Sequence, residues 1–175
     1  MSKLIIICGK PGSGKTTFAD ALAKELNLVC LHKDTIKESL YDSLNCKNLA
    51  DSKRIGRASI VLLYYLVAEQ LRAGADLIVE SPFHIQEDYP MIEGWQNDLQ
   101  ATVYTVECSI GEQERKRRCS TRPRHKSHHD ADRLIEEGVH EALEANFDSI
   151  PGKKKVLITD KPVEELVKEI LVFLS

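Results

Sequence analysis

One short glycine-rich segment near the N-terminus constrains the fold of this chain more than any other feature. Residues 9–16 read Gly-Lys-Pro-Gly-Ser-Gly-Lys-Thr, and they follow the apolar run from Leu4 to Cys8. After them, Phe18, Leu22 and Leu26 recur at helical spacing. A buried strand, a glycine-rich turn and a helix in this order predict a loop whose backbone N–H groups converge on an anion at the start of the helix.

The pattern GxxxxGKT is that of the Walker A phosphate loop, and each of its parts has a chemical reason. Gly9, Gly12 and Gly14 allow positive φ angles and a close approach of the backbone to phosphate oxygens. We expect Lys15 to reach the β and γ phosphates and the Thr16 hydroxyl to bind Mg²⁺. The predicted ligands are therefore a nucleoside triphosphate and Mg²⁺. The predicted nucleotide contacts in this loop are Gly9, Lys10, Pro11, Gly12, Ser13, Gly14, Lys15, Thr16 and Thr17.

The composition suits a soluble globular protein, with 42% hydrophobic and 29% charged residues in a chain of 175. The net charge of −3 gives no overall basic field to attract nucleic acid or an anionic membrane. The five cysteines include no CxxC pair, and no apolar stretch reaches membrane-spanning length. We therefore expect a single domain over residues 1–175 of a reduced, cytoplasmic protein without a signal peptide or a membrane partner.

Strand-like and helix-like segments alternate along the whole chain. A long helix is predicted over residues 52–73, with its second half enclosed in the core, and an amphipathic helix closes the chain after Pro162. This alternation predicts an α/β fold of parallel βαβ units with helices on both faces of the sheet. The predicted strands are Lys3–Cys8, Leu28–His32, Leu77–Glu80, Ala101–Cys108 and Lys155–Ile158.

Two acidic residues lie where predicted strands end. Ligands of open parallel sheets bind beyond the carboxyl ends of the strands, which makes Asp34 and Glu80 candidate site residues. Asp34 can accept the proton of a substrate hydroxyl or hold Mg²⁺, although a helix N-cap is an alternative role. Glu80 is a candidate for contact with Mg²⁺, with its waters or with the substrate, and a solvated strand end is the alternative.

A basic segment follows the fourth predicted strand, with seven Lys or Arg among residues 115–126. It contains no aromatic residue on which bases could stack, so nucleic acid is not the favoured partner, and a solvated helix face accounts for only part of it. We favour a lid over roughly residues 115–130, whose arginines close over the triphosphate. Arg115, Arg118 and Arg122 recur at helical spacing, and Arg118 and Arg122 are the predicted catalytic arginines.

The stretch from residue 120 to 130 is predicted to be an irregular, mobile excursion. It contains His125, His128 and His129, followed by Asp130. Loop histidines beside basic residues contact phosphate or substrate, or are exposed, more often than they bind zinc, and no cysteine lies at finger spacing. We expect no structural metal here, and the sequence assigns these histidines no single role.

Together these segments resemble a family of small P-loop kinases that are similar to gluconate kinase, chloramphenicol phosphotransferase and the zeta toxins. Members of this family are often described only as predicted kinases or AAA-type ATP-binding proteins. The resemblance extends over nearly the whole chain, although only the phosphate loop is a highly specific motif. It is carried by residues 9–16, 34–37, 79–81, 114–118, 124–128 and 159–162.

The resemblance implies a P-loop NTPase fold of the nucleoside and shikimate kinase type, with a five-stranded parallel sheet of order 2-3-1-4-5. It also implies that Asp34 is the catalytic acid of the family, and that Arg115, Arg118 and the lid arginines handle phosphate. The loop implied to lie against adenine contains Asp160, Lys161 and Pro162.

The chain departs from this family at two positions that concern the substrate. Many relatives carry Arg where this chain has Lys37, and Gly where it has Ser81, so their substrate contacts cannot be transferred. Motifs of ring-forming ATPases are absent from the sequence. The guanine-reading N/T-K-x-D pattern is also absent, which favours ATP over GTP.

The leading hypothesis is an ATP-dependent kinase that transfers the γ-phosphoryl group to a hydroxyl of a small molecule, with Lys15, Asp34, Arg118 and Arg122 as catalytic residues. A polynucleotide 5′-hydroxyl kinase is one alternative. Another is a nucleotide-dependent switch or toxin-like regulator that binds a protein partner. A monomer or a homodimer is expected, and the acceptor is not identified by the sequence.

Overall fold

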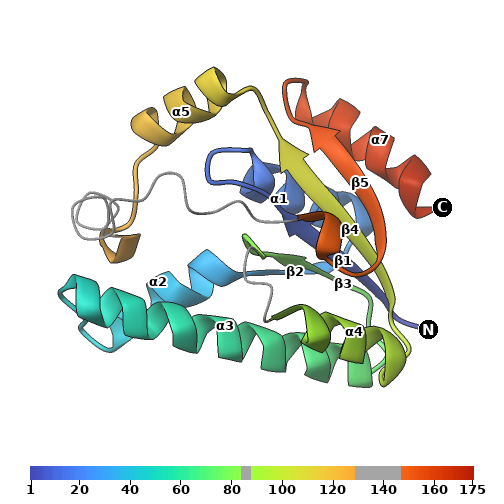
Figure 1. The fold of residues 1–175 in the computed structure, drawn as a ribbon, viewed down its shortest axis with the longest axis horizontal. Coiled ribbons are helices and arrows are strands. Elements are labelled where there is room, and N and C mark those ends of the chain that lie inside the picture. Colours follow the sequence, from blue (N-terminus) through green and yellow to red (C-terminus); the bar gives the residue numbers. More distant parts are fainter. Residues whose placement is uncertain (84–87, 129–146) are drawn as a thin grey trace.

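The computed structural model describes residues 1–83, 88–128 and 147–175, and its centre is a five-stranded parallel sheet (Figure 1). The strand order β2-β3-β1-β4-β5 confirms the predicted α/β class and topology. Two of the predicted strands, 3–8 and 77–80, have the observed bounds, and the ends of the other three differ from the observed ones by at most two residues. The strands are β1 (Lys3–Cys8), β2 (Val29–His32), β3 (Leu77–Glu80), β4 (Thr102–Ser109) and β5 (Lys153–Ile158).

Helices cover both faces of this sheet. The long helix α3 and the short α4 lie on one face, and α1 and α7 lie on the other (Figure 1). Short 3₁₀ turns η2 (Lys126–His128) and η3 (Phe147–Ser149) flank the second undescribed segment. The helices are α1 (Lys15–Leu26), α2 (Lys33–Ser43), α3 (Leu49–Arg72), α4 (Tyr89–Asn97), α5 (Glu112–Thr121) and α7 (Val163–Leu174).

The central strand β1 divides the core into two layers. Its residues Leu4 and Ile6 pack with side chains of α3 and α4, whereas Ile5 and Ile7 pack with side chains of α1 and α7. A strand alternates its side chains between two faces, and both faces of this one are covered. This explains why β1 reads as a continuous apolar run instead of an alternating one.

The long helix α3 corrects one prediction. It begins at Leu49, and its second half is not enclosed, because Val61, Leu62 and Tyr65 are exposed. The buried side chains form one stripe, as expected for a helix that lies on the outside of a sheet with a single face inward. The prediction from the nearly all-round apolar pattern of residues 60–68 therefore gave too much burial for the second half of α3. The residues of this buried stripe are Ser52, Ile55, Ser59, Leu63, Val67 and Leu71.

The carboxyl ends of the strands meet at one edge of the sheet, because all five strands are parallel. The phosphate loop, the start of α2, Glu80, the start of α5 and Thr159 all follow strands at this edge. No helix in the described part of the chain is long and apolar enough to span a membrane. The topology thus gathers most of the predicted site residues at one place.

Helix α7 offers a matched test of the second core layer. Ile170 is fully buried between α7 and the sheet, whereas Val172, two residues later, is exposed. We expect Ile170→Ala to lower the free energy of unfolding by roughly 2–5 kcal/mol, because it leaves a cavity. Val172→Ala should change it by about 0.5 kcal/mol or less. Urea unfolding of both variants checks this, and similar losses for the two would contradict the packing of α7.

Candidate active site

The phosphate loop between β1 and α1 has the backbone conformation that its glycines permit. Gly9, Gly12 and Gly14 have φ angles of 130°, 81° and 85°. A Cβ atom on Gly9 would lie only 2.3 Å from the carbonyl oxygen of Cys108 in β4. The loop is therefore a cradle that side chains at these positions would fill, as a phosphate site requires.

The polar groups around this cradle suit an anion. The Nζ atom of Lys15 crosses the loop and donates a hydrogen bond to the carbonyl oxygen of Lys10 at 3.1 Å. Ser13 is buried, and its Oγ has no hydrogen-bond partner within the described residues. Thr16 is half-buried and Thr17 is exposed in the first turn of α1. Phosphate oxygens at the N-terminus of α1 would meet free backbone N–H groups and the helix dipole.

A chain of side chains links the phosphate loop to the ends of β2 and β3. The Thr16 hydroxyl donates to Oε2 of Glu80 at 3.5 Å, and the same carboxylate oxygen lies 3.1 Å from Nδ1 of His32. The Nε2 atom of His32 lies 3.0 Å from Oδ1 of Asp20 in α1. The hydroxyl and carboxylate oxygens of Thr16 and Glu80 are ligands that Mg²⁺ prefers, so this pair fits the metal expected there.

His32 carries a positive charge in this arrangement. Hydrogen bonds to Cys30 and to Glu80 raise the pKa of His32 to about 10, against the opposing effect of burial. Burial in turn raises the pKa of the Cys30 thiol, so that thiol stays protonated near neutral pH. An imidazolium between two carboxylates holds Glu80 in place at the end of β3.

Asp34 lies in the first turn of α2 and is not its N-cap, because the helix begins at Lys33 and His32 occupies the N-cap position. Its Oδ1 lies 3.1 Å from Nζ of Lys33, and 40% of its side chain is exposed. Burial raises the pKa of Asp34, but interactions with Lys33, His128 and Arg124 outweigh burial and hold it below its usual range. Asp34 is thus an ionised and accessible carboxylate.

The three predicted metal ligands separate into two groups. Thr16 and Glu80 come together, whereas Asp34 has no hydrogen bond to either of them within the described residues. Asp34 lies instead beside the basic segment that follows α5. No cluster of three His, Cys, Asp or Glu side chains suited to a metal occurs in residues 1–83, 88–128 and 147–175.

The segment of residues 122–128, here called the strap, is docked on helices α2 and α3. Ser127 is fully buried, and its carbonyl oxygen accepts a hydrogen bond of 2.6 Å from the Ser52 hydroxyl of α3. This part of the predicted mobile excursion is therefore anchored, because buried hydroxyl and carbonyl groups pair with each other. His129 and Asp130, which the prediction also included, lie outside the described residues.

Both described histidines of the strap contact carboxylates of α2. Nε2 of His128 lies 2.8 Å from Oε1 of Glu38, and Nε2 of His125 lies 3.2 Å from Oδ2 of Asp42. Glu38 and Asp42 are four residues apart and so share one face of the helix. The strap therefore lies along the helix that carries Asp34.

Two predicted arginines of α5 lie against the phosphate loop, and the third does not lie on that helix. Arg115 donates from Nη1 to the carbonyl oxygen of Pro11 at 3.0 Å, and Arg118 donates from Nη2 to the carbonyl oxygen of Thr159 at 3.3 Å. Helix α5 ends at Thr121, so Arg122 does not share their helical face. Pro123 explains this end, because a residue before proline is disfavoured in the helical region.

The loop after β5 is tied to the phosphate loop by one buried hydroxyl. Thr159 Oγ1 donates to the carbonyl oxygen of Ser13 at 2.7 Å and lies 3.2 Å from that of Ser109. The residues predicted to lie near adenine follow directly and are exposed. These residues are Asp160, Lys161 and Pro162.

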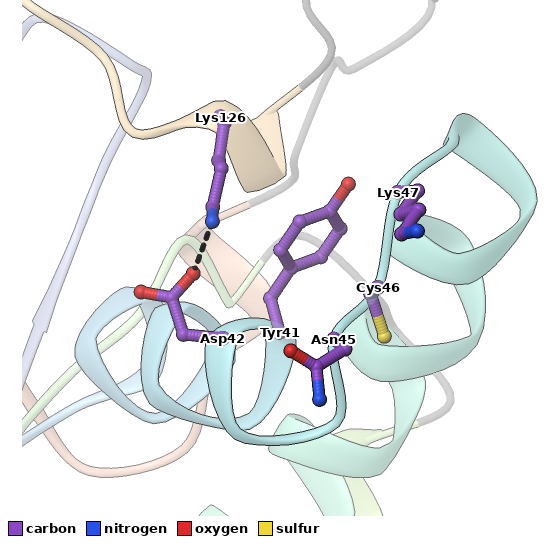
Figure 2. A pocket seen from close by; sticks show the side chains of 6 residues that line it. All are labelled: Tyr41, Asp42, Asn45, Cys46, Lys47 and Lys126. Carbon is purple, nitrogen blue, oxygen red and sulfur yellow. Dashed lines mark ion pairs between the residues drawn. The ribbon is translucent and has the colours of Figure 1, made fainter.

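Two open pockets lie away from the phosphate loop. One, of about 340 Å³, lies where α2 ends and the strap passes, and Figure 2 shows Lys126 reaching from the strap to Asp42 beside the ring of Tyr41. Tyr41 is seven residues after Asp34, or about 10 Å along the helix. The second pocket, of about 470 Å³, is lined on α3 by Ala50, Lys53, Arg54 and Arg57.

Three features of this site were not predicted from the sequence: the bridge through His32, the anchoring hydroxyl of Thr159 and the pairing of His128 with Glu38. A signal existed for His32, because it ends β2 in register with Glu80 on the neighbouring strand. The other two contacts join residues far apart in the sequence, and spacing alone contains no signal for them.

The charge of His32 makes a testable contribution to stability. Its pKa is raised from 6.5 to about 10, so the bridge stabilises the folded state fully below pH 6.5, and this contribution is lost as the pH rises through about 10. We expect His32→Gln to cost roughly 1.5–3 kcal/mol at pH 6 without Mg²⁺, and progressively less toward pH 10. Urea unfolding of both proteins over this range measures the difference, and a constant difference would show that His32 is uncharged.

The chain matches the family described as AAA domain over residues 4–150, which is most of its length. Its structure is similar to that of a presumed kinase from Chloroflexus aurantiacus, with a TM-score of 0.74 and 25% identity over 99% of this chain and 96% of that one. No protein with a curated description is significantly similar to it in sequence.

Two further solved structures share the fold. A sugar kinase from a Janibacter species has a TM-score of 0.63 and 20% identity, covering 99% of this chain and 95% of that one. An APS kinase from Mycobacterium tuberculosis, solved with AMPPNP and APS, has a TM-score of 0.64 and 19% identity, covering 99% and 97%. The chain therefore belongs to the AAA domain family AAA_33, and its fold is that of the P-loop kinases.

Proposed function

We propose that this protein is an ATP-dependent phosphotransferase that moves the γ-phosphoryl group of ATP to a hydroxyl of a small molecule. The observation that carries this proposal is the division of two carboxylates at the edge of the sheet. Glu80 accepts a hydrogen bond from Thr16 of the helix that follows the phosphate loop. Asp34 has an accessible carboxylate and lies near the strap. A kinase needs this division, because one carboxylate serves the donor and the other serves the acceptor.

The donor half is built from the phosphate loop. Backbone N–H groups of residues 9–16 and the Lys15 ammonium group would hold the phosphates of ATP, and Asp160, Lys161 and Pro162 would lie against adenine. Thr16 and Glu80 would hold Mg²⁺, directly or through its waters. When bound, Mg²⁺ supplies charge neutralisation on the phosphate oxygens.

Asp34 is the residue that would receive the proton of the attacking hydroxyl. Its low pKa keeps it ionised at neutral pH, and its exposed carboxylate is open to an acceptor. The loose transition state of phosphoryl transfer needs little basicity from this group and depends mainly on its position. Asp34 therefore orients the hydroxyl and accepts the proton as the bond to phosphorus forms.

The arginines of α5 are suited to respond to a bound triphosphate. Arg115 pairs with Glu112 at 2.7 Å, and Arg118 pairs with Glu114 at 2.9 Å. Such pairs at a helix surface contribute little free energy because solvent screens them, so phosphate oxygens can compete for these guanidinium groups. We assign Arg115 and Arg118 to the phosphates. Arg122, which leads into the strap, is assigned to the transferring phosphoryl group.

Substitutions on the acceptor side and on the ATP side of the site should separate ATP binding from phosphoryl transfer. We expect Asp34→Asn to keep ATP binding near normal and to lower phosphoryl transfer by roughly 10²- to 10⁴-fold, because the proton acceptor is lost. Lys15→Ala should weaken both ATP binding and transfer. Asp98→Asn, at the far end of α4, is the matched control. The measurements are ATP affinity by calorimetry and ATP consumption with a panel of sugars, sugar acids, nucleosides, aminoglycosides and an oligonucleotide.

The same panel tests the alternatives. Near-normal transfer by the Asp34 variant would refute the role of Asp34 as base. Phosphorylation of the oligonucleotide alone, with steep salt dependence, would make the protein a polynucleotide 5′-hydroxyl kinase. ATP-dependent capture of a protein partner without any phosphorylated acceptor would favour the regulatory switch.

A further inference from the structure

His128 contacts α2 one helical turn beyond Asp34. Its Nε2 lies 2.8 Å from Oε1 of Glu38, and only 8% of its side chain is exposed. Asp34 and Glu38 are four residues apart on α2, so their Cβ atoms lie on one face of the helix about 6 Å apart. The imidazole of His128 therefore lies beside the carboxylate that we assign to the acceptor hydroxyl.

The contact with Glu38 sets the tautomer of this imidazole. An ionised carboxylate only accepts hydrogen bonds, so Nε2 of His128 must carry the proton. Burial lowers the pKa of His128 and outweighs the opposing effect of the hydrogen bond that Nε2–H donates to Glu38, so the ring is neutral near pH 7. A neutral imidazole with its proton on Nε2 carries a lone pair on Nδ1.

The two described histidines of the strap differ in the use of their second nitrogen. Nδ1 of His125 accepts a hydrogen bond from the backbone N–H of Ser127 at 3.2 Å, while its Nε2 faces Asp42, so both nitrogens are occupied. Nδ1 of His128 has no hydrogen-bond partner within the described residues. His125 is thus a structural residue of the strap, whereas Nδ1 of His128 is an acceptor that no group in residues 1–83, 88–128 and 147–175 uses.

The strap holds this ring rigidly. The neighbouring Ser127 is fully buried, and its carbonyl oxygen is fixed by the Ser52 hydroxyl at 2.6 Å. Glu38 fixes the other side of the ring. An oriented and neutral ring nitrogen can accept a hydrogen bond from a ligand that the neighbouring carboxylate also contacts.

We propose that His128 is a specificity-determining residue, whose Nδ1 accepts a hydrogen bond from a second hydroxyl of the acceptor, next to the hydroxyl that Asp34 orients. This assignment rests on the proposed phosphotransferase activity and narrows its substrate class to compounds with two adjacent hydroxyls. Glu38 is the positioning residue that keeps the proton of His128 on Nε2. His128 only accepts a hydrogen bond from the second hydroxyl. It takes up neither a proton nor the phosphoryl group during the reaction.

The experiment compares acceptors in matched pairs that differ by one neighbouring hydroxyl. The phosphorylated hydroxyl is mapped first, and the pair is chosen so that the missing hydroxyl is its neighbour. Glucose with 2-deoxyglucose and ribose with 2-deoxyribose serve for transfer to the 1- or 3-hydroxyl, and glycerol with 1,3-propanediol serves for transfer to a terminal hydroxyl. The wild-type protein should prefer the first member of the pair that it phosphorylates by roughly 10- to 100-fold in kcat/KM, because a missing hydroxyl leaves a polar site atom unpaired. His128→Gln keeps an amide near the position of Nε2 but lacks the Nδ1 acceptor, and it should reduce this preference to about threefold or less.

Two further variants separate recognition from folding. His128→Asn places an amide oxygen near the position of Nδ1 and should retain more of the preference than His128→Gln. Lys126→Gln removes only the exposed ion pair of the strap with Asp42, at 2.9 Å, and should leave the preference intact. Loss of the preference in Lys126→Gln would overturn the assignment to His128 and point to the docking of the strap as a whole.

The outcomes distinguish this inference from the function on which it rests. Equal rates for both members of a pair in the wild type, or equal losses on both in His128→Gln, overturn the role of His128 and leave the phosphotransferase intact. If no compound is phosphorylated, the proposed function fails. The inference has a second test that needs no activity.

¹H–¹⁵N correlation spectra of the full chain at pH 7 show which ring nitrogen of His128 carries the proton. We expect the proton on Nε2 and none on Nδ1, and a proton on Nδ1 would overturn the inference.

Discussion

Burial of β1 on both of its faces is the constraint on which the rest of the structure depends. Its residues from Leu4 to Cys8 are almost completely buried, and β1 is the middle strand of the sheet. Apolar burial of this kind is the largest favourable contribution to folding, so the end of β1 is held firmly in place. Gly9 can therefore approach the backbone of β4 closely, and the phosphate loop is fixed at the edge where all five strands end.

Charge is distributed around this loop in pairs that keep the carboxylates available. Glu80 is balanced by His32, and Asp34 by Lys33 together with the basic strap. Without Lys33 and the strap, burial would raise the pKa of Asp34 and favour its neutral form. The partners come from β2, α2 and the strap, so the electrostatics of the site depend on the sheet order and on the docking of the strap.

Much of the fold was predictable, because the local patterns agreed with one another. The apolar run of β1, the loop glycines and the period of α1 all specify one arrangement, and the alternation of elements specifies the parallel sheet. The exposed side of α3 was not predictable, since residues such as Tyr65 are apolar without being buried. The docking of the strap was not predictable either, because the partner of Ser127 is Ser52, 75 residues earlier in the chain.

The two histidines nearest the predicted carboxylates show how one residue type serves opposite purposes. Both ring nitrogens of His32 face carboxylates, and its pKa is raised, so it is a cation on the donor side. Among the described residues, His128 has one nitrogen beside a carboxylate, burial lowers its pKa, and the ring is neutral on the acceptor side. Lys33 and the basic strap already supply the positive charge that keeps Asp34 ionised, so a neutral His128 adds a hydrogen-bond acceptor there and no further cation. The hydrogen bonds of His32 with Cys30 and Glu80, against the burial that dominates at His128, thus separate a residue that fixes charge from one that can recognise a hydroxyl.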